Sequence, residues 1–275
     1  MHALTAKQLE TVCAVYVHRA LTRHQLERFM PDGRSTPAWT QHLRRVELAG
    51  ALERVRVGQG PVWMVTEDGA AAAEASGRVP VRAWRPGPGI RLAPDHVLSA
   101  NEVWLEFCAA AAQADDECGV WDGDLEVLHK HGRERLITDV RLEYTRRQGK
   151  RVVTWVLLVE IDRGTRKLTD LYGQVRAYAR LHSRQRAWTQ AYRVWPRVLI
   201  VLAGMEHQAA LRRARRLREL CAADPEIGPA VRAAVTTQAL LRQGPLGDVW
   251  LPLGAPPLSP AVSLLELRSI REAAS

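Results

Sequence analysis

The chain has 275 residues, 47% of them hydrophobic and 25% charged, which is enough to form one large or two smaller folded domains. The sequence has no apolar run long enough to cross a membrane and no N-terminal signal segment, and its four cysteines lack metal-binding or redox spacing, so we expect a cytoplasmic protein with no membrane partner. The net charge of +9 favours an acidic partner but does not identify one.

A segment rich in proline and glycine divides the sequence. Residues 77–89 contain three prolines and three glycines, and Pro94 follows shortly after. Proline fixes the backbone and removes a hydrogen-bond donor, so this composition is typical of an extended linker. We therefore expect a first domain at 1–76, a linker at 77–95, a second domain at 96–244 and a C-terminal tail at 245–275.

The first domain is predicted to contain three helices and a hairpin. Apolar residues at helical spacing predict helices over 6–20, from Thr22 onward, and from 36 to about 50. Two alternating segments, 52–57 and 62–65, flank a glycine-rich turn and predict a β-hairpin, and a last helix is expected over 68–75. This order within some 75 residues is typical of a winged helix-turn-helix, in which the third helix enters the major groove of DNA.

The third predicted helix presents a polar face. If Trp39, Leu43 and Val46 point inward, the candidate DNA-binding side chains point outward, and these are Thr40, Gln41, Arg44 and Arg45. Arg54 and Arg56, on the first strand of the hairpin, are candidate phosphate contacts. Two alternatives stay open: these side chains are simply solvated, or the module binds another protein.

The second domain is predicted to be a mixed sheet with helices on its faces. A capping-box pattern at Ser99 and Glu102 predicts a helix that starts there and runs to about 114. Strands are expected at 120–128, 136–144 and 151–161, with a polar turn at 146–150, then a helix at 167–181, a strand at 197–203 and a helix at 206–221. The overall class is therefore α/β (α+β). The apolar stretch at 262–267 of the tail would dock on the core or on a second copy of the chain, which leaves a homodimer open.

Basic residues are concentrated in this second domain. Residues 141–220 hold 19 Lys and Arg against 6 Asp and Glu, an excess larger than that of the whole chain. A GC-rich genome explains arginine in place of lysine but does not explain this segregation, whereas double-stranded DNA as a partner does. Arg212 and Arg216 on the last predicted helix are candidate phosphate contacts, with solvation as the alternative.

Three acidic residues are expected to converge at strand ends. Glu160 and Asp162 are two residues apart in one strand and so share a face, and Asp139 in the neighbouring strand could share it. Carboxylates gathered in this way form hard-cation sites, so Asp139 and Glu160 are candidate Mg²⁺ ligands for metal-assisted phosphodiester cleavage. The alternative is structural, with Asp162 capping the next helix and Gly164 permitting a turn.

The string from Val159 to Thr165 (VEIDRGT), followed by Leu168, Tyr172 and Tyr178, resembles the replication-relaxation family of actinobacterial and firmicute plasmids and mobile elements. The resemblance covers roughly residues 5–205 and implies a winged helix joined to a PD-(D/E)XK nuclease-like domain. It implies catalytic roles for Asp139 and Glu160, but Asp162 stands where the family pattern expects lysine. Lys167 could replace that lysine, and Gln174 occupies a facing position where relatives carry lysine.

These observations predict a DNA-binding protein of a mobile element that serves replication or relaxation. The resemblance leaves cleavage undecided, because the expected lysine is missing. Two alternatives stay open: a winged-helix transcriptional regulator without catalysis, and an active metal-dependent DNA endonuclease that uses Mg²⁺.

Overall fold

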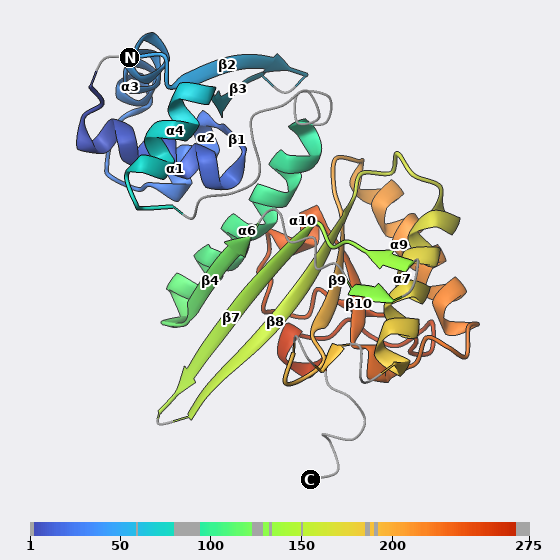
Figure 1. Ribbon diagram of the computed structural model, residues 1–275. Helices are drawn as coiled ribbons and strands as arrows, with labels where there is room; N and C mark the ends of the chain where they lie inside the picture. The colour runs from blue at the N-terminus through green and yellow to red at the C-terminus, as the bar shows by residue number, and fades with distance from the viewer. Residues whose placement is uncertain are drawn as a thin grey trace. The chain divides into compact units, whose positions relative to one another are not determined.

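The computed structural model describes residues 3–58, 60–79, 94–122, 129–131, 134–149, 151–184, 188–189 and 192–267. The chain forms two compact units, Met1–Leu105 and Glu106–Ser275, and the division falls within one long helix, α6 (Pro94–Ala114). Most of the predicted linker, residues 80–93, lies outside the described residues, as do residues 123–128 of the first strand predicted in the second domain. Figure 1 shows the elements of each unit.

Four helices and a small sheet build the first unit. The helices are α1 (Ala6–His18), α2 (Arg23–Phe29), α3 (Thr36–Leu48) and α4 (Glu67–Ala75). The strands are β1 (Ala20–Thr22), β2 (Leu52–Val57) and β3 (Gly60–Val65), and they form an antiparallel sheet in the order β1-β3-β2. The predicted helices and hairpin are confirmed, with β1 as an additional strand.

Local sequence signals start the first two helices. Thr5 and Thr22 each accept a hydrogen bond from the backbone N–H three residues on, and the side-chain oxygen of a glutamine at that position accepts one from the backbone N–H of the cap. Each capping box satisfies two N–H groups that would otherwise lack a partner at the helix start. The helix starts are therefore encoded locally.

The core of the first unit fixes the orientation of α3. Trp39, Leu43 and Val46 are at most 1% exposed and pack with buried side chains of α1 and α2 such as Tyr16 and Leu26. These three residues follow helical spacing, so they define one face of the helix. The opposite face is left to solvent.

A six-stranded mixed sheet forms the centre of the second unit, in the order β11-β10-β9-β8-β7-β4. Its strands are β4 (Glu117–Asp122), β7 (Val140–Gln148), β8 (Arg151–Asp162), β9 (Arg197–Leu202), β10 (Ala233–Thr237) and β11 (Leu251–Pro252). Strands β7 and β8 are antiparallel, whereas β8, β9 and β10 run parallel. A separate two-stranded sheet pairs β5 (His129–His131) with β6 (Glu134–Leu136). The prediction that residues 151–161 form a central strand is confirmed.

Two helices pack against one face of this sheet (Figure 1). Leu158, Ile200 and Val235 of the sheet share a buried cluster with residues of α7 (Leu168–Ser183) and α9 (His207–Ala222). Short helical turns complete the unit: η1 (Pro229–Val231), α10 (Gln238–Leu241) and η2 (Leu264–Glu266). Every second residue of β8 points to the same face of the sheet. The side chains of Leu158, Glu160 and Asp162 therefore all point toward α7 and α9.

The predicted start of α6 at Ser99 is wrong. The helix begins at Pro94, and the Ser99 hydroxyl lies inside it, where it donates to the Asp95 carbonyl at 2.8 Å. Glu102 does not cap the helix either, because its carboxylate pairs with Arg28 at 2.5 Å and accepts from the Gln25 amide at 3.3 Å. The capping pattern is thus outweighed by contacts that are distant in sequence.

Two further sequence predictions need correction. The stretch 136–144, predicted as one strand, divides between β6 and β7. Residues 146–148, predicted as part of a turn, continue β7 and pair with residues 151–153 of β8. Gly149, at φ 59°, reverses the chain immediately after them, a conformation that glycine adopts without strain.

The C-terminal tail packs on its own unit. Its strand β11 pairs with β10, Arg218 of α9 donates to the Pro256 and Ser259 carbonyls, and Leu264 and Leu267 are buried. The tail therefore docks on the core of its own chain, which is one of the two arrangements that the sequence left open.

Candidate functional site

The outer face of α3 carries the four predicted DNA-binding side chains. Thr40, Gln41, Arg44 and Arg45 are all exposed. Thr40 and Arg44, like Gln41 and Arg45, are four residues apart and therefore lie side by side along the helix. The structure thus places these four side chains on one solvent-facing surface opposite the buried Trp39.

The inner side of α3 is held by an aromatic and hydrogen-bonded contact. His42 lies 2.8 Å from the Thr11 hydroxyl and meets the Trp39 ring edge-on, and the Arg34 guanidinium lies 4.8 Å from the centre of that ring. Burial, together with the charge of Arg34, lowers the pKa of His42 to about 4. At neutral pH the imidazole is therefore uncharged, and it positions the helix without adding positive charge.

The β2 strand adds two arginines beside α3. Arg54 and Arg56 are exposed and, being two residues apart on a strand, share one face. The Nε of Arg54 lies 3.7 Å from a carboxylate oxygen of Glu47, whereas Arg56 has no ion-pair partner among the described residues. Both guanidinium groups can reach an anion in solvent.

Asp139 and Glu160 lie next to each other in the second unit. Val140 pairs with Val159, which places Asp139, the residue before β7, opposite Glu160. The Asp139 carboxylate accepts the backbone N–H of Ile161 at 2.8 Å. The expected convergence of these two carboxylates is therefore present in the structure.

Glu160 is enclosed between the sheet and α7. Its side chain is 1% exposed, and its carboxylate accepts the Tyr178 hydroxyl at 2.5 Å. Burial raises the pKa of Glu160 well above its ordinary value, and the negative charge of Asp139 raises it further. Hydrogen bonds from Tyr178 and Gln174 and the charge of Arg166 act in the opposite direction. Gln174 does occupy the facing position expected from the sequence.

Asp162 forms an internal ion pair. Its side chain is completely buried, with one oxygen 2.5 Å from the Arg213 Nε and the other accepting the Gly164 N–H at 3.2 Å. The suggestion that Asp162 caps the next helix is wrong, because α7 has Lys167 at its N-cap. The Asp162 carboxylate stabilises the turn before that helix and ties it to α9.

Arg166 is the cation that sequence reasoning missed. Its guanidinium donates to the Gln174 side chain at 3.0 Å and to the Ile161 carbonyl at 3.4 Å, beside Glu160. Lys167, the predicted replacement for the motif lysine, is exposed, and its side chain makes no hydrogen bond or ion pair among the described residues. The only signal for Arg166 in the sequence was its place in the loop between the acidic strand and α7.

The acidic pair does not fit a hydrated divalent cation. Mg²⁺ usually keeps several water ligands, but Glu160 is almost fully enclosed and the Asp139 carboxylate already accepts the Ile161 N–H. The neighbouring Asp162 uses both of its oxygens within the protein. Among the described residues, no group of three or more His, Cys, Asp or Glu side chains is arranged to hold a metal ion. One oxygen of Glu160 instead accepts the Tyr178 hydroxyl, and Arg166 and Gln174 hydrogen-bond to each other beside it.

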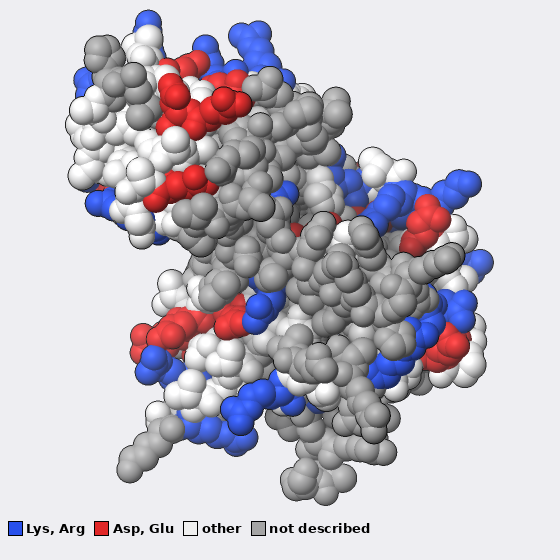
Figure 2. All heavy atoms as spheres, in the orientation of Figure 1, with Lys and Arg blue, Asp and Glu red and all other residues white. Residues whose placement is uncertain are grey.

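The arginines of α9 occupy three different environments. Arg212, Arg215 and Arg216 are exposed, and Arg216 pairs with Glu219 at 2.8 Å. Arg213 turns toward Asp162. Arg218 is buried and donates to the Pro256 and Ser259 carbonyls of the tail. Figure 2 shows Lys and Arg side chains gathered over the part of the second unit where α7 and α9 lie.

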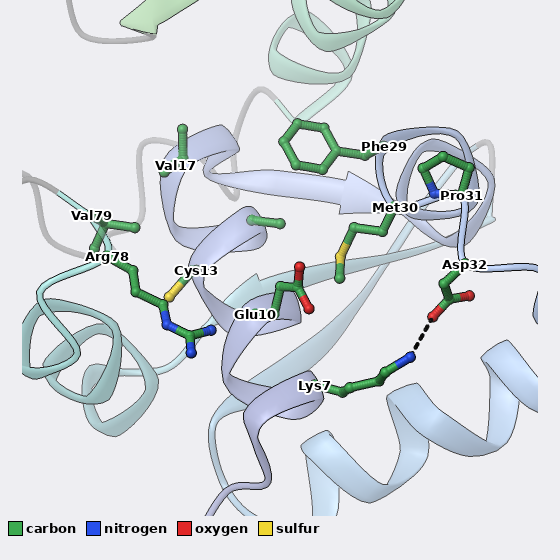
Figure 3. A pocket seen from close by; sticks show the side chains of 11 residues that line it. Lys7, Glu10, Cys13, Val17, Phe29, Met30, Pro31, Asp32, Arg78 and Val79 are labelled. Carbon is green, nitrogen blue, oxygen red and sulfur yellow. Dashed lines mark ion pairs between the residues drawn. The ribbon is translucent and has the colours of Figure 1, made fainter.

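A pocket of about 640 Å³ lies in the first unit between α1 and the segment that follows α2. Phe29, Met30 and Cys13 give it an apolar lining, and Lys7 and Asp32 pair at 3.9 Å at its edge (Figure 3). None of the predicted DNA-binding side chains lines it. The pocket is therefore separate from the outer face of α3.

Among the described residues, no helix combines the length and apolar character that a membrane span requires. No curated protein and no solved structure matches the chain. A family model described as replication-relaxation matches residues 13–198, more than half of the chain, from α1 to the start of β9. The matched segment includes the exposed face of α3 and the pair Asp139 and Glu160 and ends before α9. The chain therefore belongs to the replication-relaxation family.

Proposed function

We propose that the chain binds double-stranded DNA through the exposed face of α3, as the recognition helix of a winged helix-turn-helix. The order of elements from α1 to β3 and the three-stranded sheet β1-β3-β2 support this proposal. The observation that carries it is the separation of the two sides of α3: Trp39 and Leu43 are buried, while Gln41 and Arg44 are exposed. A helix with a packed side and a polar outer side can lie in a major groove about 12 Å wide.

Each exposed side chain has a distinct role in this proposal. Gln41 can hydrogen-bond to adenine through two atoms, and Arg44 and Arg45 can do so to guanine. Arg54 and Arg56 contact phosphates, which set the register of the protein on the duplex without reading sequence. Thr40 donates to the Thr36 carbonyl at 3.0 Å and retains oxygen lone pairs that can accept from the amino group of a base.

For the second unit we propose a nuclease-like fold that binds DNA without cleaving it. The order α6, β4, β7, β8, α7, β9, with antiparallel strands followed by a parallel crossover, supports a PD-(D/E)XK-like core. The enclosure of Glu160 and the internal pairing of Asp162 argue against a working Mg²⁺ site. Arg212 and Arg216 contact the DNA backbone in this proposal.

The membership in the replication-relaxation family indicates the process. Such a protein serves the replication or relaxation of a plasmid or another mobile element. Recognition of a duplex site by α3 and sequence-independent binding by the second unit would keep the protein on the DNA of its element.

The proposal is tested by binding of the full chain to a labelled duplex at fixed salt. Arg44→Ala and Arg45→Ala should each weaken binding by about 1–3 kcal/mol, roughly 5-fold to 150-fold, for a base-reading contact. Lys7→Ala, which also removes one positive charge but lies at the pocket of the first unit, is the matched control and should change affinity little. Equal affinities of the two arginine variants and the wild type would show that α3 does not bind DNA.

A second candidate function, metal-dependent endonuclease, is favoured by one observation, the adjacency of Asp139 and Glu160. The full chain is incubated with supercoiled plasmid and Mg²⁺ or Mn²⁺. The non-cleaving proposal predicts no nicking above the background of the Asp139→Ala and Glu160→Ala variants. Nicking that depends on the metal and is lost in both variants would replace that proposal with the endonuclease.

A further inference from the structure

Strands β7 and β8 extend beyond the sheet as a two-stranded hairpin. Strand β9 pairs with β8 only from Leu157 to Asp162, and β4 pairs with β7 only as far as Thr145. The pairs between residues 146–148 and residues 151–153 therefore have no further strand beside them among the described residues. We call the paired residues 146–148 and 151–153 the arm; Figure 1 shows the long hairpin of β7 and β8 to which it belongs.

The arm is basic and contains no acidic residue. Its six residues include three arginines, Arg146, Arg147 and Arg151. Arg146 and Arg151 have no ion-pair partner among the described residues. Arg147 pairs with Glu117 at 2.6 Å, but both side chains are more than half exposed, so this pair is weak and open to exchange.

The arginines lie on both faces of the ribbon. Residues that pair directly across two antiparallel strands share a face, so Arg146 lies with Val153 on one face and Arg147 lies with Val152 on the other. Arg151 pairs with Gln148 and shares the face of Arg146. A ribbon with cations on both faces can approach the phosphates of both strands that border a DNA groove.

A strand edge of this kind is unsuited to pairing with a second copy. Two basic edges repel each other, and positive charge on an edge is a common means of preventing edge-to-edge association. A two-stranded ribbon, in contrast, fits the major groove of B-DNA, and its positive charge complements the phosphates. Val152, which is 57% exposed, adds an apolar surface that can contact the edge of a base.

We propose that the arm is a separate duplex-DNA contact that inserts along a groove and is anchored on phosphates by Arg146 and Arg151. The inference rests on the proposed DNA binding of the chain. It adds an interaction surface that lies outside both α3 and α9.

The test is the salt dependence of duplex binding by the full chain. Each lost phosphate contact lowers the slope of log affinity against log salt by about 0.9. The Arg146→Ala/Arg151→Ala double variant should therefore lower it by about 1.8, with binding roughly 60-fold weaker at about 0.1 M salt. A control with the same charge change combines Lys7→Ala in the first unit with Arg242→Ala at the exposed C-cap of α10. It should leave the slope near the wild-type value, and circular dichroism should show that both variants are folded.

A hydroxyl-radical footprint provides a second readout. Loss of the arm should remove protection from part of the wild-type footprint while leaving the part that depends on Arg44. An unchanged slope and footprint in the Arg146→Ala/Arg151→Ala variant would overturn the inference. A change in the oligomeric state of that variant without a change in DNA binding would overturn it as well. If the wild type binds no duplex, the proposed function fails first. If the wild type binds duplex DNA and the Arg146→Ala/Arg151→Ala variant binds it equally well, only the inference about the arm is refuted.

Discussion

The helices α3 and α9 both carry several arginines, yet the structure uses them differently. On α3, Arg44 and Arg45 both face solvent because Trp39 and Leu43 occupy the opposite side. On α9, Arg213 is bound to Asp162, Arg218 is buried against the tail, and the exposed Arg216 pairs with Glu219. The number of arginines on a helix therefore overstates the positive surface that it offers to DNA.

The largest expected effect comes from Arg213. Arg213→Ala would leave the fully buried Asp162 without its partner, which destabilises a protein by about 3–5 kcal/mol. Urea denaturation measures the change. Arg212→Ala, one residue earlier and exposed, should lie within about 0.5 kcal/mol of the wild type.

Asp162→Asn in the Arg213→Ala background removes the buried charge and should recover part of the lost stability. Similar stabilities for the Arg212 and Arg213 variants would contradict the division of α9 into internal and exposed arginines.

A smaller effect is expected from the exposed arginines of α9. Arg212→Ala should weaken binding of all duplex sequences to a similar degree and lower the salt slope by about one, as expected for a phosphate contact. Arg216→Ala should have less effect because Glu219 already neutralises part of its charge. Affinities measured over a range of salt concentrations test both variants.

A change in sequence preference with Arg212→Ala would mean that α9 reads bases. The helix α9 would then read bases as proposed for α3, whereas we expect its exposed arginines to contact phosphates only.

The smallest effect concerns Glu160. Its raised pKa means that, between the ordinary pKa of glutamate and the raised one, the folded chain holds a proton that the unfolded chain has released. Stability therefore falls as pH rises through that window. Glu160→Gln keeps an oxygen to accept from Tyr178 and lacks the titration, so it should flatten the pH profile and gain stability over the wild type toward neutral pH.

Denaturant midpoints at several pH values, for the wild type and Glu160→Gln, measure this difference. Parallel pH profiles would show that Glu160 is ionised in the folded chain, as a metal-binding carboxylate would be.

Where local pattern determines structure, the sequence was sufficient. The spacing of Trp39, Leu43 and Val46 predicted which side of α3 is exposed, and the apolar run in β8 predicted a central strand. Strand period also put Glu160 and Asp162 on one face of their strand, whereas it left open whether Asp139 shares that face. These features depend on a few neighbouring residues and on pairing between consecutive strands.

Features that depend on distant partners were not predictable. β1 has three residues and exists because it pairs with β3, some forty positions later. The pairing of Asp162 with Arg213 joins residues 51 positions apart, and no periodicity signals it. Arg166 reaches the acidic pair because the loop after β8 folds back over Ile161. The sequence supplied the carboxylates of the site but not the groups that surround them.

Whether α3 reads DNA sequence is decided by selecting ligands from a pool of duplexes with randomised sequence. The full chain and the Gln41→Ala/Arg44→Ala and Arg212→Ala/Arg216→Ala variants are compared. We expect the wild type to enrich a defined motif, the α3 variant to lose it, and the α9 variant to retain it with weaker binding. Enrichment of the same motif by all three proteins, or of none by the wild type, would show that α3 does not read sequence.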